Sequence, residues 1–438
     1  MSAHRHTHAG PGFRSVDDHI ATVAALFGPP RVITVPIADA LGRALAIDVI
    51  AAVALPGFDN SAMDGYAVRS VDVVQATAAT SVRLPVAQDI PAGRTDVLTL
   101  LPGTAHRIMT GAPLPLGADA VVPVEATDAG TDTVTIRESV PAGASVRRAG
   151  SDIEVGEPAL PAGTVVTPPA IGLLAALGHA QVEVIAPLHA VVLSTGSELV
   201  APGQPLAHGQ IHESNGAMLC AALQSAGAMA SLVHFVPDDV EQFRTRLDAI
   251  IDGHAASTPV DLIITSGGVS AGAYEVVKDA LTGHGVDFVK VAMQPGKPQG
   301  SGHYTTVSGT SLPIVTLPGN PVSAQVSFEV FVRGPLRATM GLPARRRRTL
   351  ATLTDALHSP AGTRQFRRGV LRAGPANPGR PGQHSDPDNH TATVVPIGPP
   401  SSHHLRYLAS SNALIDIPAD VVDLAAGDEV EVIVLDQP

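Results

Sequence analysis

The stretch Val260-Asp-Leu-Ile-Ile-Thr-Ser-Gly-Gly-Val-Ser270 decides the fold of this chain. A short apolar run bounded by turn residues is typical of a fully buried strand. The glycines that follow indicate a turn into a helix, which we expect from Tyr274 to Leu281. A buried strand that passes through a glycine turn into a helix is the repeating unit of a parallel α/β sheet.

The neighbouring segments repeat this alternation of strand and helix between about residues 187 and 342. It predicts a doubly wound, largely parallel sheet. In such sheets, ligands bind beyond the carboxyl ends of the strands. The other expected strands are 189–193, 230–235 and 312–317, and the other expected helices are 215–226, 240–251 and a segment after Asn320.

The chain before this α/β segment has a different character. A helix capped by Ser15 is expected to end before Gly28, and shorter helices are expected over 36–41 and 168–178. Residues 55–150 alternate short β-rich runs with Gly and Pro turns, which predicts a small β-domain.

The chain after the α/β segment returns to short β patterns over 345–438. Within it, 373–391 is rich in Gly, Pro, Asn, Asp and His, and we expect a mobile hairpin insertion. The run Arg345 to Arg348 has two interpretations, a solvated linker face or a local contact with an anion or a partner.

Composition excludes several classes of protein. The 438 residues hold 28 Lys and Arg against 40 Asp and Glu, a net charge of −12, so a general nucleic-acid binder is disfavoured. Charged residues are 16% and apolar residues 45%, which excludes extensive disorder. A single cysteine, Cys220, excludes an internal disulfide, and we expect it to be buried. With neither a signal-peptide pattern nor an 18-residue apolar stretch, we expect a soluble, cytoplasmic protein without membrane insertion.

Three loops that follow predicted strands carry glycine together with Ser, Thr or Asn. Glycine lets the backbone approach a ligand, so that N–H groups face phosphate oxygens, and hydroxyls add further donors. One such loop is usually an ordinary turn, but three at one sheet edge favour a phosphate site. Neither a P-loop nor a G-x-G-x-x-G pattern occurs at these turns. The candidate ligand-binding residues are Ser194, Thr195, Gly196, Gly267, Gly268, Ser270, Pro318, Gly319, Asn320 and Ser323.

Carboxylates accompany these loops. Glu198 lies in the first loop, Asp238 and Asp239 follow the strand at 230–235, and Glu275 begins the helix after the second loop. Hard oxygen ligands beside phosphates suit Mg²⁺, with Asp238 and Glu275 as metal candidates. The alternative for the Asp pair is a helix N-terminal cap. Lys297, in a tight turn, is either an anion contact or simply solvated.

Taken together, these motifs resemble the molybdenum insertases of molybdenum-cofactor biosynthesis, a family that includes the bacterial MoeA proteins and the eukaryotic gephyrin E domain. The resemblance covers roughly residues 13 to 436 and keeps the family's order of motifs. The motifs are Pro56-Gly-Phe-Asp-Asn-Ser-Ala-Met-Asp-Gly-Tyr-Ala-Val68, Ile108-Met-Thr-Gly-Ala-Pro113, Arg147-Arg-Ala-Gly-Ser-Asp152, Ser194-Thr-Gly-Ser-Glu-Leu199, Ser266-Gly-Gly-Val-Ser270, Pro295-Gly-Lys-Pro298 and Leu317-Pro-Gly-Asn-Pro-Val-Ser-Ala324.

The resemblance implies four subdomains and an elongated homodimer whose site is shared between chains. It implies a molybdopterin molybdotransferase that converts adenylylated molybdopterin and molybdate into molybdenum cofactor and AMP. Molybdopterin adenylyltransferase is then a candidate partner. The implied subdomains are an elongated N-terminal one (13–54 with 148–186), an inserted small β-domain (55–147), the α/β molybdopterin-binding domain (187–342) and a C-terminal β-barrel (345–438).

The family's active-site positions are carried over by motif. The resemblance assigns acidic and polar catalytic positions to Asp64, Thr110, Asp152, Glu198 and Asp238. It makes Lys297, Arg368 and Ser402 the molybdate candidates, the last two through a looser C-terminal match.

The chain departs from the family pattern at three positions. Ser197 and Glu275 stand where the family often has Asp, and Gln294 stands where it usually has Lys. Gln294 removes a cation from an anion site, so a weakened paralogue that acts as a gephyrin-like scaffold for a cytoskeletal or membrane-receptor partner is the alternative function. A stand-alone molybdopterin adenylyltransferase is a third interpretation, but it has no need of residues 1–185 or the barrel.

Overall fold

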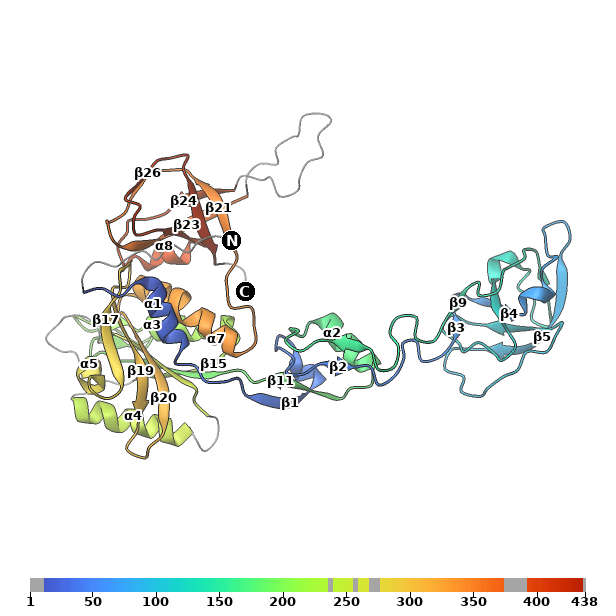
Figure 1. Ribbon diagram of the computed structural model, residues 1–438, viewed down its shortest axis with the longest axis horizontal. Coiled ribbons are helices and arrows are strands. Elements are labelled where there is room, and N and C mark those ends of the chain that lie inside the picture. The colour runs from blue at the N-terminus through green and yellow to red at the C-terminus, as the bar shows by residue number, and fades with distance from the viewer. Residues whose placement is uncertain (1–11, 235–238, 255–258, 268–275, 374–391, 436–438) are drawn as a thin grey trace. The chain divides into compact units, whose positions relative to one another are not determined.

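The computed structural model describes residues 12–234, 239–254, 259–267, 276–373 and 392–435 (Figure 1). The chain divides into two compact units. The large unit combines Met1–Ile33 with Ile185–Pro438, and the small unit is Thr34–Val184. The predicted hairpin insertion lies almost wholly outside the described residues.

A six-stranded sheet forms the centre of the large unit and confirms the predicted α/β fold. Its first four strands in spatial order are parallel, and the fifth strand pairs antiparallel with the fourth and with the sixth. These antiparallel pairings were not predicted, because β19 contains two glycines and four polar residues, Gln299, Ser301, His303 and Thr305, instead of an apolar run. The order is β15 (Met229–His234), β12 (His189–Ser194), β16 (Leu262–Ser266), β20 (Ser311–Leu317), β19 (Pro298–Thr305) and β17 (Val286–Lys290).

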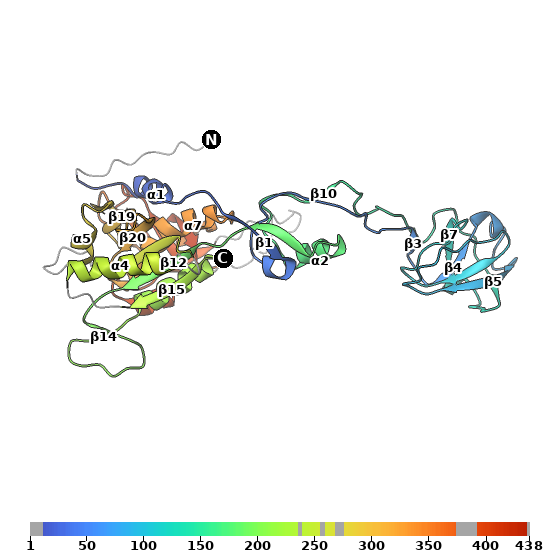
Figure 2. The same cartoon turned by 90° about the horizontal axis from the view of Figure 1, so that it is seen from below.

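Helices cover both faces of this sheet, as a doubly wound fold requires (Figure 2). Val191 and Leu193 of β12 pack under one pair of helices, while Ala190 and Val192 face the other set, as alternation along a strand dictates. The first pair is α4 (Val240–His254) and α5 (Val276–Leu281), and the other set is α1 (Val16–Ala24), α3 (Asn215–Ser225), α6 (Pro321–Ser327) and α7 (Arg333–Thr339).

Two local features of these helices follow from their sequences. Ser15 caps α1, as predicted: its hydroxyl oxygen accepts from the Asp18 N–H at 3.0 Å. Between α6 and α7 the helix continues through a π turn, η4 (Phe328–Val332), in which the N–H of Arg333 donates to the Phe328 carbonyl. Cys220 of α3 is half-buried against the core, and burial raises the pKa of its thiol.

The C-terminal strands close into a barrel, which confirms the predicted one. Five strands follow one another in the ring, and pairing between the first and the last closes it. The short strand β18 (Met293–Gln294) joins the outside of β23, and α8 (Leu405–Ala409) follows residues 401–404. The ring is β23 (Arg364–Arg372), β24 (Thr393–Pro396), β21 (Arg348–Leu353), β27 (Glu429–Val434) and β25 (Ala413–Ile417), and β22 (Leu357–His358) pairs with β26 (Asp423–Leu424).

The small unit holds the β-rich sequence between 55 and 150. Its five-stranded sheet has the order β7 (Ala120–Pro123), β4 (Gly65–Val68), β6 (Ala105–Ile108), β5 (Val82–Ile90) and β8 (Thr133–Ile136). The predicted helix at 168–178 is α2 (Pro168–Ala176), and that at 36–41 is a single 3-10 turn, η1 (Ile37–Ala40). The two-stranded pairs are β1 (Val32–Pro36) with β11 (Gln181–Ile185), β2 (Val49–Ile50) with β10 (Pro158–Leu160), and β3 (Asn60–Ser61) with β9 (Val146–Arg147).

No helix in the described ranges combines the length and the apolar character needed to cross a bilayer. The finer division into 13–54 with 148–186, 55–147, 187–342 and 345–438 stays a prediction.

Candidate functional site

The three predicted glycine loops meet at the carboxyl edge of the sheet. A Cβ added to Gly267 would lie 3.5 Å from the carbonyl oxygen of Thr195, and one added to Gly319 would lie 3.4 Å from the Gly267 Cα. Gly267 has φ +101°, a conformation that side chains with a Cβ rarely adopt. Bare backbone from three loops therefore faces the same small region, which we call the glycine-loop edge.

Two residues that the sequence analysis missed hold this edge together. Glu213 is buried, and its Oε1 accepts from the Ser194 hydroxyl at 3.0 Å and from the Gly216 N–H at 2.6 Å. Asn215 Nδ2 donates to the Ser266 hydroxyl at 2.9 Å and to the Gly319 carbonyl at 2.6 Å. Glu213 precedes α3 by two residues and Asn215 is its first residue, so the start of this helix links all three loops.

The third loop also contacts the segment that follows the barrel strand β24. Asn320 Nδ2 donates to the Ser402 hydroxyl at 2.9 Å, and the Val322 N–H donates to the Ser402 carbonyl at 3.2 Å. Ser402, a molybdate candidate, therefore lies beside the glycine-loop edge. Pro318 and Ser323 are buried, so they shape the loop from beneath.

Arg368, another molybdate candidate, is buried in β23. Its Nη1 donates to the Ser401 carbonyl at 3.1 Å, and its Nη2 donates to the Pro399 carbonyl. Burial lowers the pKa of this guanidinium. Arg368 therefore fixes the segment that carries Ser402 and brings positive charge close to it.

The Gln294-Pro295 turn shares a crevice with Arg368, Val322 and Pro400. Gln294, one of the three departures described in the sequence, accepts through its Oε1 from Gln365 Nε2 at 2.8 Å. Lys297 lies exposed with its ammonium 5.7 Å from the centre of the Phe13 ring. An amide pair therefore occupies one side of the crevice, and Arg367 and Arg368 supply positive charge to its lining.

In the small unit, Asp64 and Thr110 come together as a pair. Asp64 Oδ1 accepts from both the backbone N–H and the hydroxyl of Thr110, each at 2.7 Å. The backbone bond first, and then the hydroxyl bond, lower the pKa of Asp64. Both side chains are exposed, so this carboxylate stays ionised and faces solvent.

The remaining acidic candidates divide into exposed groups and a helix cap. Glu198 and Asp152 are exposed, and the Glu198 carboxylate folds over Gly196. Asp239 Oδ1 accepts from the Gln242 N–H at 2.8 Å, which confirms the capping alternative for this residue.

Four predicted residues lie outside the described ranges: Gly268, Ser270, Asp238 and Glu275. Within the described ranges, no group of three or more His, Cys, Asp or Glu residues is placed to hold a metal ion. The two predicted Mg²⁺ ligands are therefore untested. Glu198 is an exposed carboxylate at the glycine-loop edge, which fits a metal that takes one protein carboxylate together with substrate phosphates.

Three family models match successive segments of the chain and together cover nearly its whole length. "MoeA N-terminal region (domain I and II)" matches residues 14–178, "Probable molybdopterin binding domain" matches 191–338, and "MoeA C-terminal region (domain IV)" matches 350–435.

Curated relatives extend this similarity. The chain is 55% identical over 427 residues to molybdopterin molybdenumtransferase 2 of Mycobacterium tuberculosis, covering 96% of this chain and 99% of the relative. It is 36% identical over 444 residues to molybdopterin molybdenumtransferase 1 of the same organism, covering 97% and 99%. A solved structure of a molybdopterin biosynthesis MoeA protein from Pyrococcus horikoshii has 29% identity and a TM-score of 0.77, covering 97% of this chain and 100% of that one.

Proposed function

The chain belongs to the MoeA family, and from this premise we propose that it inserts molybdenum from molybdate into adenylylated molybdopterin and releases AMP. It is a transferase of molybdenum-cofactor biosynthesis, as its relatives' names indicate. The observation that carries the proposal is the convergence of Thr195, Gly267 and Gly319 beside Ser402.

This convergence suits a phosphorylated substrate. Backbone N–H groups of the glycine loops bind phosphate oxygens without a side chain in between. Arg368 and the hydroxyl of Ser402 attract an oxyanion to the neighbouring segment. In the proposed reaction, the two dithiolene thiols form two Mo–S bonds, and one molybdate oxygen leaves as water with their two protons. A separate water molecule attacks the phosphoanhydride bond, and AMP departs.

We propose Mg²⁺ as the cofactor, held by Asp238 or Glu275 together with Glu198 and the substrate phosphates. The ion would neutralise charge on the phosphoanhydride and favour AMP as the leaving group. Activity that persists in full with a chelator present, after dialysis, would contradict this assignment.

We further propose a homodimer in which Asp64 and Thr110 of one chain complete the site of the other. The observation behind this is that the predicted residues fall in two separate compact units. Closed two-fold symmetry would give two composite sites. Asp64→Ala mixed with Gly267→Asp should regain a fraction of wild-type activity. If verified subunit exchange restores none, each chain builds its own site.

The direct test of the proposed function is AMP release by the purified full chain with adenylylated molybdopterin, with and without molybdate. We expect AMP only when molybdate is present. Absence of release with both substrates bound would overturn the proposal.

The scaffold alternative has no support among the relatives described above, which are named as transferases. A contact with molybdopterin adenylyltransferase and a cytoplasmic location remain predictions. Co-purification with that enzyme would test the first, and cell fractionation would test the second.

A further inference from the structure

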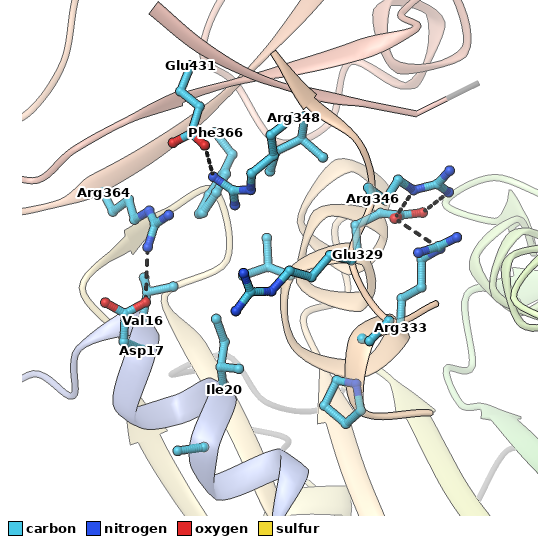
Figure 3. A pocket seen from close by; sticks show the side chains of 17 residues that line it. Val16, Asp17, Ile20, Glu329, Arg333, Arg346, Arg348, Arg364, Phe366 and Glu431 are labelled. Carbon is cyan, nitrogen blue, oxygen red and sulfur yellow. Dashed lines mark hydrogen bonds and ion pairs between the residues drawn. The ribbon is translucent and has the colours of Figure 1, made fainter. Parts of the chain in front are cut away.

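An arginine-lined cavity of about 590 Å³ lies in the large unit, apart from the glycine-loop edge (Figure 3). Its walls come from α1, from the π turn η4 with α7, and from barrel strands β21, β23 and β27. Ile20, Phe366 and Ile433 supply apolar wall, and the arginine run noted in the sequence supplies much of the rest. We call this space the arginine cavity.

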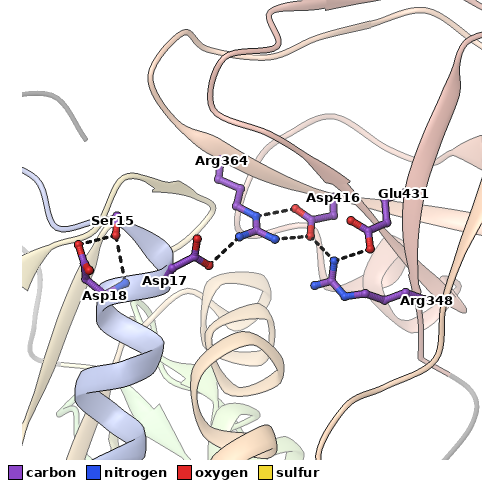
Figure 4. Close-up of polar contacts among 7 residues, drawn as sticks. All are labelled: Ser15, Asp17, Asp18, Arg348, Arg364, Asp416 and Glu431. Carbon is purple, nitrogen blue, oxygen red and sulfur yellow. Dashed lines mark hydrogen bonds and ion pairs between the residues drawn. The ribbon is translucent and has the colours of Figure 1, made fainter. Parts of the chain in front are cut away.

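Two of its arginines are committed to carboxylates. Arg364 donates to both oxygens of Asp416, at 2.8 and 2.7 Å, and to Asp17 of α1 at 3.1 Å (Figure 4). Arg348 Nη1 contacts Asp416 at 2.9 Å and Glu431 at 3.0 Å. These ion pairs link α1 to the barrel and fix one wall of the cavity.

On the opposite wall, two arginines share one carboxylate, so positive charge exceeds negative charge there. Arg346 makes a bidentate pair with Glu329, at 2.8 and 3.0 Å. Arg333 reaches the same carboxylate only at 3.8 Å, beyond hydrogen-bond distance, and Figure 3 shows both guanidinium groups directed at Glu329. One carboxylate therefore serves two arginines.

Arg333 is the unusual member of this group. Its side chain is only 2% exposed, and neither Nε nor Nη1 has a hydrogen-bond partner. Burial and then the charge of Arg346 lower the pKa of Arg333 to about 10, so the group is still charged at neutral pH. A buried, charged donor without an acceptor is costly, and such groups call for a partner.

We propose that the arginine cavity is a binding site for a small phosphorylated molecule, with Arg333 and Arg345 as its anion contacts. The lining carries five guanidinium groups, from Arg333, Arg345, Arg346, Arg348 and Arg364. Four carboxylates oppose them, from Asp17, Glu329 and Glu431 of the lining and from Asp416, which pairs with Arg348 and Arg364. The planar arginine fork matches phosphate oxygens, and the volume suits a metabolite-sized ligand.

The chain provides matched variants for a test. Arg345 is exposed and lines the cavity, whereas Arg347 is exposed in the same run but does not line it. Arg333→Met keeps the aliphatic bulk and removes the unsatisfied donors, and Arg346 still pairs with Glu329. Arg333→Met should therefore fold at least as stably as wild type.

The measurement is isothermal titration calorimetry of the full chain with pyrophosphate at constant ionic strength. We expect binding to wild type and to Arg347→Ala, and binding about tenfold or more weaker for Arg345→Ala and Arg333→Met. Pyrophosphate that binds at the glycine-loop edge should bind all four proteins equally. The binding that remains in Arg333→Met therefore measures that site and can be subtracted. Molybdate-dependent AMP release should be equal in all four.

Two outcomes would overturn the proposal. One is equal pyrophosphate affinity in wild type and in both cavity variants. The other is Arg333-dependent binding of citrate or of an oligoglutamate peptide with none of pyrophosphate, which would make the ligand a polycarboxylate or an acidic protein segment. Either result leaves the proposed molybdenum transfer untouched, because the AMP assay reports on that separately.

Discussion

The glycine-loop edge of the large unit and the Asp64–Thr110 pair of the small unit present opposite chemistry to a ligand. At the edge, the buried carboxylate of Glu213 accepts hydrogen bonds from Ser194 and Gly216, while glycine backbone faces outward. In the pair, the carboxylate itself faces outward, and two donors from Thr110 keep it ionised.

The two regions therefore suit different ligands. A surface of backbone donors receives an anion such as a phosphate, whereas an exposed, persistently ionised carboxylate receives a cation or orients water. Because the two regions offer different chemistry to a ligand, they should respond differently to substitution.

The largest effect is expected from Gly267→Asp. A side chain at φ +101° would strain the loop, and a carboxylate there would repel phosphate, so we expect affinity for adenylylated molybdopterin to fall at least about 100-fold. Gly283→Asp is the matched control, because Gly283 has φ +77° and open space around it. Equal loss of affinity in both variants would remove the glycine-loop edge from the site.

A smaller effect is expected from Glu213→Ala. Loss of this carboxylate leaves the buried Ser194 hydroxyl and the Gly216 N–H without acceptors, which should lower the free energy of unfolding by roughly 3 kcal/mol. Urea unfolding measures this, with exposed Glu429→Ala as control. Substrate affinity should fall as well, because the start of α3 no longer holds the loops. An unfolding midpoint unchanged from wild type would show that Glu213 does not organise the edge.

The smallest effect is expected from Thr110→Val. The hydroxyl bond is lost but the backbone bond remains, so the pKa of Asp64 should rise only part of the way to its ordinary value. Because the folded-state pKa is lowered, the carboxylate stabilises the fold above its unfolded pKa, and that contribution is lost as pH falls through the folded one. Carboxyl NMR titration measures the rise.

The control for this titration is Asp128. Its hydrogen bond with Thr135 is the largest of the effects that lower its pKa to about 2, and this pKa should be unchanged in Thr110→Val. An Asp64 titration identical to wild type would mean that the backbone N–H alone sets its acidity.

Features encoded by local sequence were predictable. The apolar runs that became β12, β16 and β20, and the glycines that follow them, located the edge, because strand burial and turn chemistry are local properties. The Ser15 cap followed from the same kind of signal.

What depends on distant partners was not predictable. Glu213 precedes a helix by two residues and is indistinguishable in sequence from an exposed acid, because its partner Ser194 lies at the end of β12, nineteen residues earlier. The sequence makes Arg368 a candidate anion contact, but its hydrogen bonds to backbone carbonyls depend on residues 399–404, more than thirty positions away.

The π turn at Phe328–Val332 changes the direction in which side chains leave the helix, so that α7 presents its residues at a different angle from α6. One extra residue in a turn rotates everything beyond it by about 100° relative to a regular α-helix. Before the turn, Ser323 and Ser327 are buried, and the Ser327 hydroxyl accepts from Gln299 of β19 at 2.7 Å, while beyond the turn Arg333 lines the arginine cavity. Deleting one residue of the turn would restore a continuous rod and swing Arg333 away from that cavity while the α6 register stays fixed. The π turn thus sets the direction of the α7 side chains separately from that of the α6 side chains, so the length of the turn can change one without changing the other.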